Sequence, residues 1–98
     1  MSSEQLMALQ EVRRTLGYAA LGVMVGPDRA RSAHEAVSAA REEVGSTDAI
    51  QGLVRAVDAL HRGFMPEPAA LREGQRQAHQ LIHVLQERGQ QINVSRDR

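Results

Sequence analysis

Glycine and proline divide this sequence into four segments, and each segment has the apolar spacing of an amphipathic helix. In the first segment, for example, Leu9, Val12 and Leu16 follow one another at steps of three and four, and no alternating run is long enough to indicate a strand. Gly-Pro, Gly-Ser and Gly-Phe-Met-Pro sequences mark the breaks between the segments. The predicted helices cover residues 3–25, 27–44, 48–62 and 67–89.

Bulky apolar side chains are scarce in the chain. Leu, Ile, Val and Phe together make up 22 of 98 residues, alanine alone makes up 14, and aromatic residues 2%. Small side chains let helices approach closely, and short connections make consecutive helices antiparallel. The sequence therefore predicts an all-α fold, a four-helix bundle of antiparallel helices that forms a dimer. We expect a single helical domain over residues 1–90 and a polar, frayed tail over residues 91–98.

Composition excludes several kinds of chemistry. The chain has no cysteine, so it has no disulfide, thiol nucleophile or iron–sulfur ligand. All 12 of its Lys and Arg residues are arginine, which excludes a lysine Schiff base or a phosphate-loop lysine. We expect no cofactor and no nucleic-acid partner, because the formal net charge is zero and aromatic stacking residues are nearly absent.

The most apolar stretch, residues 16–26, is too short to cross a bilayer, which requires about 20 residues. We therefore expect no membrane partner and a cytoplasmic location. Within this stretch the first predicted helix is apolar on every side, which is typical of a helix at the centre of a bundle or in a subunit interface. The interpretation we favour is a homodimer interface. Its candidate residues on this helix are Gly17, Ala20, Leu21 and Met24.

A second candidate surface lies on the last predicted helix, where Arg72, Arg76, His79 and His83 share one side. Such a face binds an anion or an acidic partner, although an ordinary solvated face has the same pattern. His79 and His83 are four residues apart and could supply half of a metal site. The sequence contains no Glu-x-x-His pair, which a di-metal bundle requires, so we predict no metal.

His61 is in phase with the apolar positions Ile50, Val54 and Val57. We therefore expect it to be a buried polar side chain with one hydrogen-bond partner, or a contact at an interface or to a ligand.

These patterns favour a non-enzymatic protein–protein interaction module, such as a small adaptor, chaperone or regulator, that acts as a homodimer. One alternative is a regulator that binds a small molecule or a metal through His61, His79 and His83. The second alternative is a small all-α enzyme. The sequence shows neither a nucleophile beside a base nor a phosphate-binding glycine loop.

Overall fold

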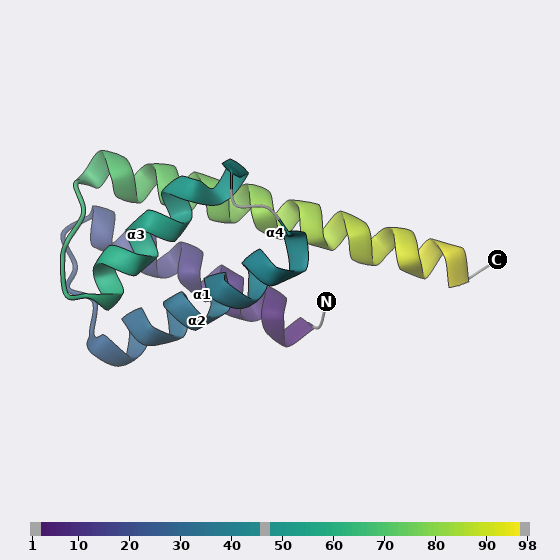
Figure 1. Ribbon diagram of the computed structural model, residues 1–98, viewed down its shortest axis with the longest axis horizontal. Helices are drawn as coiled ribbons and strands as arrows, with labels where there is room; N and C mark the ends of the chain where they lie inside the picture. Colours follow the sequence, from purple (N-terminus) through teal and green to yellow (C-terminus); the bar gives the residue numbers. More distant parts are fainter. Residues whose placement is uncertain (1–2, 46–47, 97–98) are drawn as a thin grey trace.

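The computed structural model describes residues 3–45 and 48–96, with side chains as far as Glu87. Four α-helices pack against one another, and the described part of the chain contains no strand, so the predicted all-α fold is confirmed (Figure 1). A 3-10 turn, η1, precedes the third helix. The elements are α1 (Ser3–Ala20), α2 (Pro27–Val44), η1 (Asp48–Ile50), α3 (Gln51–His61) and α4 (Pro68–Arg96).

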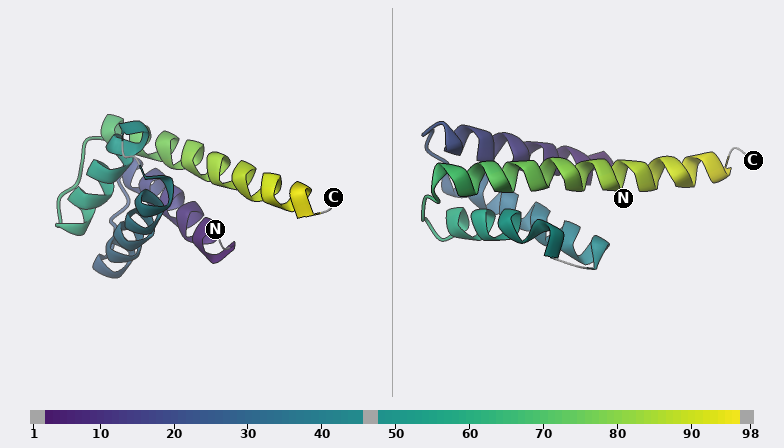
Figure 2. Two further views of the ribbon diagram at one scale, coloured as in Figure 1. Left: turned by 45° about the vertical axis from the view of Figure 1, so that its right-hand side comes forward. Right: turned by 90° about the horizontal axis from the view of Figure 1, so that it is seen from above.

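Each helix contacts two others. Helix α1 packs against α2 and α4, and α3 packs against the same two helices from the other side (Figure 2). The connections α1–α2 and α3–α4 lie together at one end of the molecule (Figure 1). The core is built from small and medium aliphatic side chains, as the composition predicts. Its largest fully buried apolar members are Leu9, Leu16, Leu53, Leu71, Val12 and Val57.

Gly74 on α4 is buried against residues of both α1 and α3. A Cβ atom at this position would lie 3.2 Å from the Cβ of Ala56 and 3.4 Å from Cδ1 of Leu16. Both distances are short for carbon atoms, which prefer about 3.5–4.0 Å. The absence of a side chain at Gly74 thus allows three helices to pack around a core that has few bulky side chains.

Two helix ends differ from the prediction. Helix α1 ends at Ala20 rather than at Val25, because Gly22 has a positive φ of 89° that stops the helix. Helix α4 continues past the predicted stop at Gly89 and ends at Arg96, and its last turns project beyond the other helices (Figure 1). The tail expected over 91–98 therefore begins inside α4. Its fraying stays a prediction, and residues 97–98 lie outside the described residues.

Among the described residues, none of the helices combines the length and apolar character that crossing a membrane requires.

Candidate protein-docking surface

The end of α1 is a Schellman motif centred on Gly22. The backbone N–H of Val23 donates to the carbonyl of Tyr18 over 2.9 Å, and that of Gly22 donates to Ala19 over 3.0 Å. These two bonds satisfy carbonyls that the end of a helix would otherwise leave free. The chain turns at this point, so the apolar residues that follow lie in the α1–α2 connection instead of extending the helix.

Helix α3 ends in the same way at Gly63, whose φ is 90°. The N–H of Phe64 donates to the carbonyl of Ala59 over 2.8 Å, and the N–H of Gly63 donates to Leu60 over 3.1 Å. Phe64 and Met65 then lie in the α3–α4 connection. Two motifs of the same design thus place apolar residues in both connections at one end of the bundle.

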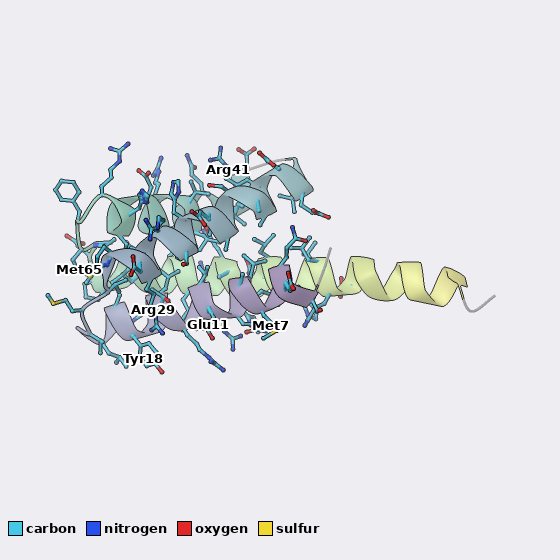
Figure 3. The ribbon with its side chains drawn as sticks, turned by 90° about the horizontal axis from the view of Figure 1, so that it is seen from below. Met7, Glu11, Tyr18, Arg29, Arg41 and Met65 are labelled. Atoms are coloured by element: carbon cyan, nitrogen blue, oxygen red, sulfur yellow. The ribbon has the colours of Figure 1, made fainter. Side chains whose placement is uncertain are left out.

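These connections carry a large apolar surface. Met24 is 88% exposed, Leu21 80% and Phe64 68%, and Tyr18 and Met65 lie at the same end of the molecule (Figure 3). Large exposed apolar patches on a small monomer commonly mark an interaction site. We call this surface the loop-end patch. Its members are Tyr18, Leu21, Val23, Met24, Phe64 and Met65.

The four interface residues predicted on the first helix separate into two pairs. Leu21 and Met24 belong to the loop-end patch. Gly17 instead faces α4, where a Cβ atom would lie 2.7 Å from Nε2 of Gln75, and Ala20 is half-buried against the core. Gly17 and Ala20 therefore serve contacts within the chain. Phe64 and Met65 were missed by the sequence analysis, because nothing in the pattern shows that the two connections meet.

The predicted arginine and histidine face of α4 is solvent-exposed at all four positions. Arg76 forms an ion pair with Glu73, one turn earlier on the same helix. His83 forms another with Glu87, with 3.2 Å between Nε2 and Oε1. Two of the face's four side chains thus have acidic partners on their own helix, as is common on solvated helix faces.

His79 has a different neighbour. Nη1 of Arg13, on α1, lies 2.7 Å from Nδ1 of His79. Because a guanidinium only donates, Nδ1 accepts this hydrogen bond and the ring proton is on Nε2. His79 and His83 therefore turn to separate partners and do not converge on one point.

His61 is exposed, and the expectation of a buried histidine is wrong. The predicted stripe was aligned on Ile50, which lies in η1 and not in α3, so its phase does not continue into the helix. Helix α3 instead buries Leu53, Ala56, Val57 and Leu60. Leu60, and not His61, closes the core at the end of the helix.

The structure brings His61 beside His34 of α2, with ring centroids 4.4 Å apart and planes tilted by 42°. Asp58 lies next to the pair, since its Oδ1 is 3.9 Å from Nε2 of His34. Its Oδ2 is 3.2 Å from Nε of Arg62. This cluster couples α2 to α3 at the surface. Its histidines are separate from those on α4.

In the described part of the chain, no group of three or more histidine or carboxylate side chains is arranged to hold a metal ion. The comparisons with known proteins add no assignment, because no family model, no curated protein and no solved structure matches the chain.

A second surface feature is a groove of about 480 Å³ between the end of α2, η1 and α4. Three separate elements form it, so no local sequence pattern reveals it. We call it the α2–α4 groove. Its lining residues are Val44, Ala49, Ile50, Gln80, Leu81, His83 and Val84.

Proposed function

We propose that the chain is a non-enzymatic protein–protein interaction module, an antiparallel four-helix bundle that acts as a homodimer through its loop-end patch. The observation that carries this proposal is the exposure of six large apolar side chains at one end of a small bundle. Leaving such side chains in water forgoes about 1.5–3 kcal/mol each relative to full burial. A partner surface would recover part of that free energy.

A second copy of the chain fits this surface by area. If each side chain presented about 200 Å² when fully exposed, as aromatic side chains do, the patch would offer at most roughly 700–800 Å². A stable protein–protein interface of standard size buries about 800 Å² on each partner. The patch placed on its own copy about a two-fold axis would therefore supply the apolar centre of such an interface, and polar atoms around it would supply the rest.

The charge of the chain also favours a second copy of itself as the partner. The formal net charge of the chain is zero, so two copies experience no net long-range repulsion. Residues in the centre of a two-fold interface meet their own counterparts, and a patch made of Leu, Met, Val, Phe and Tyr tolerates this because it places no like charges opposite each other. A strongly acidic or basic partner surface would gain little electrostatic binding free energy from such a patch.

Sedimentation velocity of the full chain tests the proposal. We expect the wild type to sediment as a dimer and Leu21→Arg as a monomer, with unchanged helix content because Leu21 lies outside the core. Val84→Arg is the matched control, since it places the same charge on an exposed aliphatic position of the α2–α4 groove. A monomeric wild type, or a Leu21→Arg variant that stays dimeric, would refute the proposal.

A further inference from the structure

The α2–α4 groove and the loop-end patch occupy different parts of the bundle. The patch lies at the end where α1 meets α2, whereas the groove begins at Val44, the last residue of α2 (Figure 1). Its walls include the aliphatic side chains of Ile50, Leu81 and Val84, and Val84 is 42% exposed. A groove of this volume is within the range of ordinary ligand-binding sites, about 300–1,000 Å³.

Two carboxylates lie near this apolar surface. Asp48 is the chain neighbour of the lining residue Ala49, and Glu87 forms an ion pair with the lining residue His83. The C-terminus of α2 adds the negative end of a helix dipole. Arg41, in the last turn of α2, is a cation in the same region.

We infer that the α2–α4 groove docks an amphipathic helix of a partner protein, one that carries a stripe of aliphatic side chains flanked by Arg or Lys. The aliphatic stripe would fill the groove, as in other helix-in-groove complexes. The basic flanks would meet Asp48 and Glu87. An extended peptide fits less well, because the described part of the chain has no sheet edge to pair with its backbone.

This inference goes beyond self-association. The loop-end patch joins two copies, and the α2–α4 groove of each copy remains available to a different protein. A homodimer with two such grooves is an adaptor that presents two partner helices at once, and its overall affinity for a paired target benefits from bivalence.

Fluorescence anisotropy with two synthetic peptides tests the groove directly. The first is a labelled peptide of about 15 residues with Leu at every third or fourth position and Arg between them, and the second has Glu in place of Arg. We expect the full chain to bind the Arg peptide about tenfold more tightly than the Glu peptide. Added salt should reduce the difference, because the flanking charges are exposed.

A matched pair of substitutions separates groove binding from nonspecific attraction. Val84→Gln makes the groove wall polar without changing charge, and Val23→Gln makes the same change at a similarly exposed valine in the loop-end patch. We expect Val84→Gln to weaken binding of the Arg peptide about tenfold and Val23→Gln to leave it unchanged. Equal binding of both peptides, or an unchanged affinity in Val84→Gln, would overturn the inference.

The same peptide titration on Leu21→Arg distinguishes the two proposals. If Leu21→Arg is monomeric and still binds the Arg peptide, both the patch and the groove are supported. If the wild type is monomeric but binds the peptide through Val84, homodimerisation fails and the groove stands. If the wild type is dimeric and its affinity does not respond to Val84→Gln, the groove fails alone.

Discussion

The side chain of Gln77 on α4 caps the beginning of α3 by accepting a hydrogen bond from the backbone N–H of Leu53 over 2.8 Å. Helix α3 has no side-chain cap of its own, since its N-cap residue is Ile50. The opposite atom of the same amide, Nε2, donates to Oε1 of Glu73 over 3.0 Å. One side chain therefore satisfies a free donor of α3 and ties it to α4.

Replacing Gln77 by Ala should destabilise the fold by about 1 kcal/mol, the usual value of a lost N-cap. Urea denaturation measures this free energy of unfolding. Gln86→Ala is the control on the same helix, because the side chain of Gln86 is solvent-exposed. Equal stability of Gln77→Ala and Gln86→Ala would contradict a capping role for Gln77.

The Schellman motif at Gly22 predicts that two glycines four residues apart differ in how much replacement by alanine changes the free energy of unfolding. Gly22 has a φ of 89°, whereas Gly26 has a φ of −70° and ψ of 157°, which any residue adopts. Gly22→Ala should cost about 1–2 kcal/mol. Gly26 is the N-cap residue of α2, where Ala is less favourable than Gly, so Gly26→Ala should have a smaller cost of about 0.5 kcal/mol. A Cβ atom meets nothing within 4 Å at either position, so thermal denaturation of the two variants isolates the backbone effect.

The packing of small residues could be predicted from the sequence, and the loop-end patch only in part. Leu9, Val12 and Leu16 repeat at helical spacing, and all three are buried as expected. Gly22 falls inside the helix predicted over residues 3–25, because its positive φ depends on the Schellman hydrogen bonds and not on spacing alone. Phe64 joins the patch only because the folded helices bring two distant connections to the same end.

Histidines show why side-chain chemistry is harder to predict. Their neighbours depend on the tertiary arrangement of helices, which periodicity does not encode. His61 meets His34 across α2 and α3, and His79 meets Arg13 across α1 and α4. For His83, spacing within one helix correctly predicted an exposed side of α4. Its ion-pair partner, Glu87, lies one turn further along the same helix.

Zinc should leave the melting temperature of the chain unchanged. A ligand that binds only the folded state would raise it, by an amount that grows with the logarithm of the ligand concentration above its Kd. His34 and His61 lie together, but Asp58 is engaged by Arg62, and no third ligand completes a site among the described side chains. Differential scanning fluorimetry with stoichiometric zinc and with EDTA checks this prediction. A rise of several degrees with zinc would contradict it and revive the metal-binding alternative.

The carboxyl of Glu73 predicts a weak pH dependence of stability. Hydrogen bonds from Arg76 and Gln77 hold the pKa of Glu73 below its ordinary value of 4.5. A lowered pKa in the folded state means that the stabilisation is fully present above about pH 4.5 and is lost as the pH falls through the folded pKa. Glu73→Gln should therefore be less stable than wild type at neutral pH, and urea denaturation at decreasing pH should show the difference shrinking. A difference that stays constant down to pH 3 would argue against this role.

The arrangement of two copies can be measured by double electron–electron resonance, because the chain has no cysteine and one spin label is easily introduced. Glu67→Cys places the label beside the loop-end patch, and Glu87→Cys places it far along α4. A dimer joined through the patch predicts a Glu67 label-to-label distance shorter than the 48 Å length of one molecule and a Glu87 distance longer than the Glu67 distance. The reverse order, or no dipolar coupling at either position, would contradict the account.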